Sequence, residues 1–120
     1  MKALFDTCIL IDYLNGVEAA RTELALYREK YISAITWMEV LVGAIMATEA
    51  ATRLFLDGFQ LIEIDGAIRE ETVALRRAYR IKLPDAMIWA SARIHGLDLI
   101  TRNTKDFSET LPQIRIPYRL

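Results

Sequence analysis

The chain has 120 residues, of which 53% are hydrophobic and 26% are charged. A chain of this length and hydrophobic content can bury the core of one domain, residues 1–120, without stabilising disulfides or metal ions. The single cysteine excludes an intramolecular disulfide and agrees with a reducing, cytoplasmic location. Asp6 and Asp12 interrupt the only apolar segment that resembles a signal peptide, and no stretch approaches the roughly 20 apolar residues of a membrane helix. We therefore expect a soluble protein with no membrane partner.

Charge is spread unevenly along the chain, although the net charge is only −1. Residues 1–75 carry 6 basic and 12 acidic side chains, whereas residues 76–105 carry 7 basic and 2 acidic ones. A basic segment of this kind can attract a polyanion. It can equally be the solvated face of a helix, and charge alone favours this second interpretation.

Strand-like and helix-like segments alternate in chain order. The first half predicts a strand at 2–5, helices at 7–14 and 17–28, a strand at 31–34, and helices at 37–47 and 48–57. The second half predicts a strand at 59–64, helices at 67–80 and 84–95, a strand at 97–101 and an edge strand at 114–116. Asn15-Gly16 and Gly96 mark helix ends, and Thr36 is the predicted cap of the helix 37–47. The alternation predicts an α/β fold, with a parallel sheet covered by helices on both faces.

Acidic residues stand where three of these elements begin or end. Asp6 directly follows the first strand, Glu39 lies early in the helix 37–47, and Asp85 opens the helix 84–95. Ligands of parallel α/β folds bind outside the carboxyl ends of the strands, so we expect the three carboxylates to converge there. Carboxylates that meet near a core repel each other unless a cation compensates, and Mg²⁺ or Mn²⁺ suits such oxygen donors.

Each of these carboxylates also has a purely structural explanation. Asp6 can cap the helix 7–14, Glu39 can close a capping box with Thr36, and Asp85 is favoured by the dipole of its own helix. Taken singly, none of the three indicates a function. Asp12 is interpreted as a surface acid or as the structural partner of a basic side chain.

Other kinds of site fit the sequence less well. His95 is the only histidine and Cys8 the only cysteine, which argues against a tetrahedral zinc site. A histidine-dependent nucleophile would need His95, which we place at the opposite end of its helix from Asp85. The five glycines are scattered and form no phosphate-binding loop.

The segments LFDTCILIDYL, YISAITWMEVLVGA and IKLPDAMIWASARIHGLDLITRNTKDF together resemble the PIN domain, specifically the VapC toxins of toxin–antitoxin pairs. The resemblance covers nearly the whole chain with the motifs in the right order and spacing. It implies a single α/β/α domain with a mainly parallel sheet of about five strands. It further implies a metal-dependent endoribonuclease that cleaves cellular RNA with Mg²⁺ or Mn²⁺ and is inhibited by a small cognate antitoxin. Homodimers are frequent in this family, and the apolar side chains between Leu41 and Leu56 are candidates for a dimer surface, with ordinary helix packing as the favoured alternative.

Carried over onto this sequence, the resemblance gives Asp6, Glu39 and Asp85 the roles of metal ligands. Asn103 is a fourth catalytic candidate and stands where the family often has an acidic residue. Its neutral amide suits the positioning of a water or an outer ligand, but it puts a second metal in doubt. An accessory role falls to Asp106, whose alternative is an exposed loop acid. Arg102 and Lys105 adjoin the site in sequence and are candidates for RNA binding, with solvated surface charge as the alternative.

Two other functions remain open from the sequence. The first is a PIN-like scaffold that binds RNA or protein without strong cleavage, which the missing fourth acid permits. The second is another Mg²⁺-dependent α/β protein, such as a receiver domain. That class usually has a second aspartate two residues after the first, where this chain has Cys8.

Overall fold

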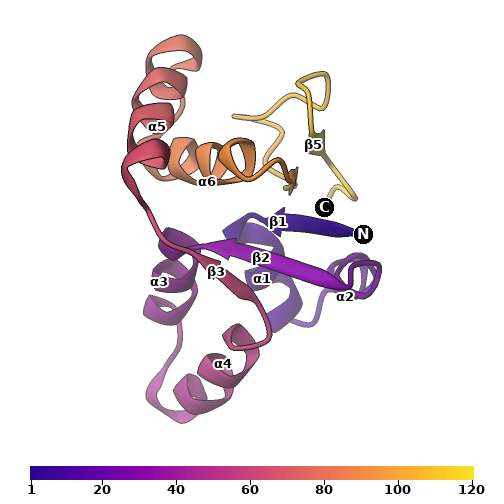
Figure 1. The fold of residues 1–120 in the computed structure, drawn as a ribbon. Helices are drawn as coiled ribbons and strands as arrows, with labels where there is room; N and C mark the ends of the chain where they lie inside the picture. The colour runs from indigo at the N-terminus through magenta and orange to yellow at the C-terminus, as the bar shows by residue number, and fades with distance from the viewer.

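A parallel sheet organises residues 1–120, all of which the computed structural model describes (Figure 1). Its strands are β1 (Lys2–Phe5), β2 (Glu29–Ser33), β3 (Gln60–Ile62), β4 (Asp98–Ile100) and β5 (Ile114–Arg115). The order across the sheet is β3-β2-β1-β4-β5, and every neighbouring pair is parallel. The predicted α/β class with five parallel strands is confirmed, and the first strand of the chain lies at its centre.

Helices cover both faces of this sheet (Figure 1). They are α1 (Thr7–Leu14), α2 (Glu18–Ala25), α3 (Ala34–Val42), α4 (Glu49–Leu56), α5 (Gly66–Tyr79) and α6 (Leu83–Ile94), with a 3₁₀ turn, η1, at Met46–Thr48. Helices α5 and α6 lie on one side, and α1 to α4 lie on the other (Figure 1). None of the helices combines the length and apolarity that crossing a membrane would take.

Alternate residues of β1 supply two separate cores, as the twofold period of a strand requires. Leu4 belongs to a cluster of 14 buried residues built around Trp89 on the α5–α6 side. Ala3 and Phe5 belong to a cluster of 12 buried residues on the opposite side. There the Phe5 ring meets the Tyr27 ring edge-on, with centroids 5.2 Å apart. Since β1 is buried on both faces, its carboxyl end has a fixed position.

Most predicted helix ends are confirmed, but the cap of α3 is not the predicted one. Ser33, rather than Thr36, caps this helix by accepting a hydrogen bond from the Ile35 backbone N–H. Thr36 is fully buried inside the helix, so the predicted capping box with Glu39 does not exist. The helix ends at Val42 instead of continuing to Ala47. Sequence alone could not choose between two cap-forming side chains one turn apart; the end of β2 at Ser33 decides it.

Candidate functional site

The pairing of β1 with β4 sets the location of the site. Phe5 lies opposite Ile100, and the backbone N–H of Asp6 donates to the Ile100 carbonyl at 2.9 Å. The residues that follow the two strands therefore emerge side by side at the carboxyl edge of the sheet. Helix α3, which follows β2, brings Glu39 to this edge, and the first turn of α6 brings Asp85.

The three predicted carboxylates line one open cavity of about 450 Å³. Three of the four predicted residues after β4, Arg102, Asn103 and Lys105, also line it. The remaining lining residues are Thr7, Cys8, Ile11 and Thr104. Asp106 is not among the lining residues. The structure thus brings six of the seven predicted site residues to a single cavity.

Asp6 is buried at the base of this cavity, where it both caps α1 and faces the other acids. Its Oδ1 accepts from the Thr7 backbone N–H at 2.8 Å, and its Oδ2 accepts from the Thr101 hydroxyl at 2.6 Å. Burial raises the pKa of Asp6 above its ordinary value, against these hydrogen bonds, and the Glu39 carboxylate adds to the rise. The cap function and the site function that the sequence left as alternatives are thus compatible in one side chain.

A threonine hydroxyl orients Glu39. Thr7 Oγ1 donates to Glu39 Oε1 at 2.7 Å and lies 3.0 Å from the hydroxyl of Thr36. The residue that follows Asp6 in sequence therefore fixes the carboxylate that α3 presents. Glu39 itself is exposed on the cavity side.

The surroundings of Asp85 also raise its pKa. Partial burial and the neighbouring carboxylates of Asp6, Asp106 and Glu39 raise its pKa to about 7. Asp106 is held in place by Asn103, whose Nδ2 donates to Asp106 Oδ2 at 3.0 Å, while the Asp106 N–H donates back to Asn103 Oδ1. Asn103 thus lines the cavity and also holds Asp106, which does not line it.

The donor set fits a hard divalent cation, because carboxylate oxygens from three elements face one polar cavity, where Glu39 helps to raise the pKa values of Asp6 and Asp85. The side chains are not, however, drawn together tightly. Nowhere in the chain do three His, Cys, Asp or Glu side chains form a group ready to hold a metal ion. Mg²⁺ usually retains several water ligands and takes only one or two protein carboxylates directly, so the wider spacing agrees with that ion.

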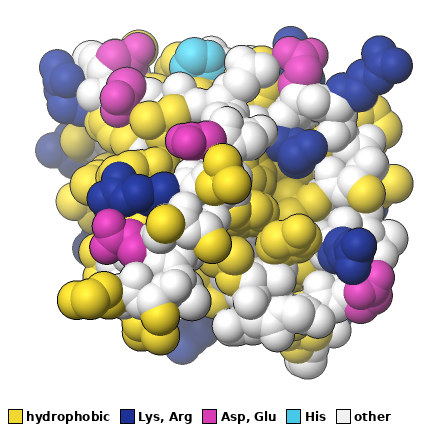
Figure 2. All heavy atoms as spheres, turned by 90° about the horizontal axis from the view of Figure 1, so that it is seen from below, with side chains coloured by type: hydrophobic (Ala, Val, Ile, Leu, Met, Phe, Trp, Pro, Cys, Tyr) yellow, Lys and Arg dark blue, Asp and Glu magenta, His cyan; other side chains and the backbone are white.

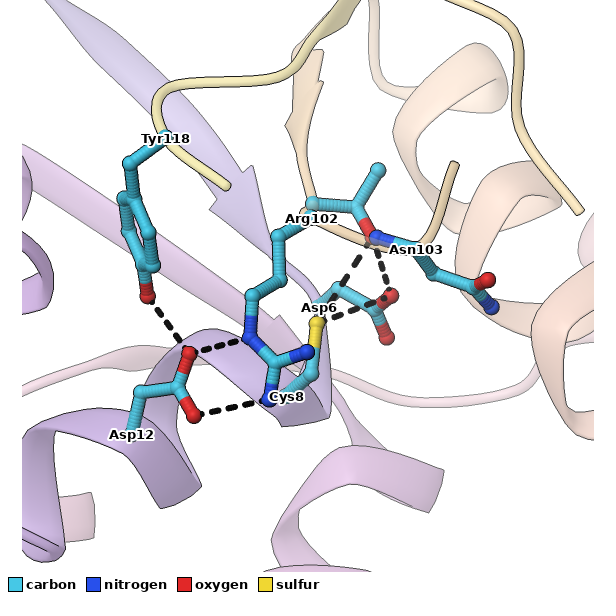
Figure 3. Close-up of polar contacts among 7 residues, drawn as sticks. Asp6, Cys8, Asp12, Arg102, Asn103 and Tyr118 are labelled. Carbon is cyan, nitrogen blue, oxygen red and sulfur yellow. Dashed lines mark hydrogen bonds and ion pairs between the residues drawn. The ribbon is translucent and has the colours of Figure 1, made fainter. Parts of the chain in front are cut away.

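Arg102 is bound to the helix that carries Asp12 (Figure 3). Both oxygens of the Asp12 carboxylate accept from the Arg102 guanidinium, and the Tyr118 hydroxyl donates to Asp12 Oδ2 at 2.8 Å. Asp12 is only 4% exposed, so the surface interpretation was wrong and the alternative, a partner for a basic side chain, is confirmed. The hydrogen bond from Arg102 holds the pKa of Asp12 below its ordinary value.

Three supporting residues escaped the sequence analysis: Thr7, Thr101 and Tyr118. A signal for Thr101 existed, because it is the polar last residue of the predicted strand 97–101. Tyr118 gave no signal, since it lies beyond the last strand in an irregular segment. His95 is the exposed C-cap of α6, at the opposite end from Asp85, as predicted.

Comparisons with known proteins agree with this geometry. A family model of the PIN domain matches residues 3–110. No curated protein matches the chain. The chain is similar to one in a toxin–antitoxin complex from Klebsiella pneumoniae, with 49% identity over 98% of this chain and 99% of that chain and a TM-score of 0.94.

Two further solved structures share the fold. A chain of DNA-bound VapBC from Salmonella typhimurium is 26% identical over 96% of both chains, with a TM-score of 0.77. A chain of VapBC2 from Rickettsia felis, bound to a DNA fragment from its promoter, is 20% identical over 95% of this chain and 96% of that chain, with a TM-score of 0.79. The matched model covers most of the chain and the fold agrees throughout, so the chain belongs to the PIN domain family.

Proposed function

We propose that this chain is a Mg²⁺- or Mn²⁺-dependent endoribonuclease, the toxin of a VapBC-type toxin–antitoxin pair, acting as one domain in the cytoplasm. The observation that carries the proposal is the convergence of Asp6, Glu39 and Asp85, from three separate elements, on one polar cavity at the carboxyl edge of the sheet. The 49% identity to a chain of a toxin–antitoxin complex, over 98% of this chain, supports the toxin role.

In the proposed reaction, the protein binds and orients an RNA phosphate at this cavity. Asp6, Glu39 and Asp85 would hold the divalent ion, whose chemistry is to polarise a phosphoryl oxygen and lower the pKa of water. Thr101 and Thr7 keep the carboxylates of Asp6 and Glu39 oriented through their hydroxyl groups. Lys105, exposed at the rim of the cavity, is suited to a flanking phosphate of the substrate.

Asp6→Asn tests the proposal most directly. Asparagine caps a helix about as well as aspartate, so the substitution removes a charge from the cavity while it preserves the start of α1. We expect the purified parent to cleave RNA in the presence of Mg²⁺ or Mn²⁺ and the variant to lose this activity, with new RNA 5′ ends mapped for both. Asp98→Asn, at an exposed position at the start of β4, is the matched control. Equal cleavage by Asp6→Asn and the parent would mean that the site is assigned wrongly.

A second candidate function is an RNA- or protein-binding scaffold without strong cleavage. Two observations favour it: no three acidic side chains are already grouped for a metal ion, and a neutral amide stands at Asn103. Titration with Mg²⁺ separates the candidates. RNA binding without cleavage at any Mg²⁺ or Mn²⁺ concentration would support the scaffold, whereas metal-dependent cleavage would exclude it.

An antitoxin and a second copy of the chain are the proposed protein partners. Figure 2 views the α1–α4 side and shows hydrophobic surface across its middle. The exposed apolar side chains around α3, η1 and α4 include Val42 (85% exposed), Ile45 (67%), Met46 (95%) and Leu54 (74%). Sedimentation over a range of concentrations tests the homodimer, and a strict monomer would contradict it. Relief of growth arrest by a small protein encoded next to this chain tests the antitoxin.

A further inference from the structure

A buried network joins three distant segments beside the cavity (Figure 3). Asp12 in α1 accepts from Nε and Nη2 of Arg102, the second at 2.9 Å, and from the hydroxyl of Tyr118. Arg102 is the second residue after β4, which ends at Ile100, and Tyr118 belongs to the segment after β5. The Arg102 side chain is about one third exposed, whereas Asp12 is 4% exposed. The carboxylate is thus a buried anchor, and the guanidinium reaches from it toward solvent.

The anchor leaves one part of the guanidinium free. A guanidinium carries five N–H donors in a rigid plane, and Asp12 occupies the Nε–Nη2 edge. The remaining nitrogen, Nη1, has no acceptor in the protein. Figure 3 shows it on the side of Cys8 and Asp6, and all three residues line the carboxylate cavity. The cavity is otherwise rich in acids that repel a phosphate, so this free donor is well placed to receive one.

We infer that Asp12 and Tyr118 are positioning residues, which hold Arg102 so that its Nη1 donates to a phosphate oxygen of RNA in the carboxylate cavity. The inference rests on the proposed nuclease function. Because Asp12 offsets the charge of Arg102, the contribution is a fixed hydrogen-bond direction rather than long-range attraction. This separates Arg102 from Lys105, which is exposed and has no acidic partner in the structure.

The chain contains a matched control for this network. Glu23 in α2 is also 4% exposed. It accepts from Nε and Nη2 of Arg115 at 2.7 and 3.0 Å and from the hydroxyl of Tyr27 at 2.9 Å. The chemistry is the same: a buried carboxylate, a two-nitrogen arginine contact and a tyrosine hydroxyl. Neither Glu23 nor its partners line the carboxylate cavity.

The experiment compares Asp12→Asn with Glu23→Gln. For each variant, kcat and KM for RNA cleavage are measured at several salt concentrations, together with the midpoint of denaturant unfolding. We expect similar losses of stability but a fall in kcat of about tenfold or more only for Asp12→Asn, the size typical of a lost charge-assisted hydrogen bond. The direction of the change in RNA binding is informative, because Asp12→Asn adds net positive charge beside the cavity. A purely electrostatic role would strengthen RNA binding and leave kcat unchanged.

Arg102→Lys supplies a second readout. Lysine keeps the charge but cannot contact Asp12 with two nitrogens and still present a third donor. We expect kcat to fall about as far as in Asp12→Asn, with little change in the salt dependence of binding. For Lys105→Ala, loss of a simple phosphate contact should reduce the slope of log K against log salt by about 0.7.

Equal kcat values for Asp12→Asn and Glu23→Gln would overturn the inference. If Asp12→Asn does not fold, Tyr118→Phe against Tyr27→Phe decides it, with a lower kcat expected for the first variant alone. Cleavage by the parent protein reports on the proposed function independently. An inactive parent contradicts that function and the inference with it, whereas an active parent with unaffected variants contradicts only the inference.

Discussion

Asp85 should destabilise the protein in the absence of metal. Its pKa in the folded chain rises from 3.8 to about 7 because it is partly buried and faces the carboxylates of Asp6, Asp106 and Glu39. A group whose pKa is raised by folding stabilises the fold at low pH, and this contribution is lost as pH rises through the folded value. At pH 8 the ionised Asp85 therefore opposes folding, and Asp85→Asn should remove the opposition.

The magnitude follows from the shift and the exposure. A rise from 3.8 to about 7 corresponds at most to about 4 kcal/mol, at about 1.4 kcal/mol for each factor of ten in the equilibrium. Asp85 is only partly buried, so solvent screening reduces this to about 1–2 kcal/mol. Loss of the carboxylate from the first turn of α6 costs about 0.5 kcal/mol. We expect Asp85→Asn to raise the free energy of unfolding at pH 8 by about 1 kcal/mol.

Denaturant unfolding at pH 8 in a chelator measures this effect, with Asp98→Asn as the control at an exposed position. The gain should vanish below about pH 4, where Asp85 is protonated in both states. Mg²⁺ at ten times its dissociation constant should stabilise the parent by about 1.4 kcal/mol and should stabilise the variant much less. If Asp85→Asn is less stable than the parent at pH 8 without metal, repulsion among the cavity carboxylates is not the dominant influence on Asp85.

Two smaller predictions concern other residues. Thr101→Val removes the 2.6 Å hydrogen bond to Asp6 Oδ2 and should weaken Mg²⁺ binding by about tenfold, measured by calorimetry; unchanged affinity would contradict a positioning role for this hydroxyl. Gly96→Ala should lower the free energy of unfolding by about 1 kcal/mol, because Gly96 has φ +65° with no atom near its missing Cβ, so the cost is conformational. Gly43→Ala, at φ −76°, is the control and should be neutral or stabilising.

The alternation of elements and the central acids were predictable because both depend on local patterns. Apolar periodicity located β1, α1 and α6 within one residue, and the rule on strand ends directed attention to Asp6 and Glu39 before any contact was known. The fold class followed from the order of strands and helices. The purely structural explanation of Glu39, a capping box with Thr36, was wrong because Thr36 is not the cap of α3.

What escaped prediction depends on contacts between distant segments. Asp12 lies on the helix that follows the first strand, yet its burial results from Arg102 and Tyr118, 90 and 106 residues later. Charge patterns along the sequence gave no pairing at this range. The same limit hid the hydrogen bond from Thr101 to Asp6, which exists only because β4 lies next to β1.

The central position of β1 has a consequence for how the chain matures during synthesis. β1 is synthesised first but cannot pair with β4 until much later, because Asp6 and its hydrogen-bond donor Thr101 are 95 residues apart. Such long-range pairing is slow and is completed late in folding. A nascent chain that stops before β4 lacks the neighbour that closes the carboxyl edge beside β1. The carboxylate cavity is therefore assembled only near the end of translation, and shorter fragments should carry its acids without its geometry.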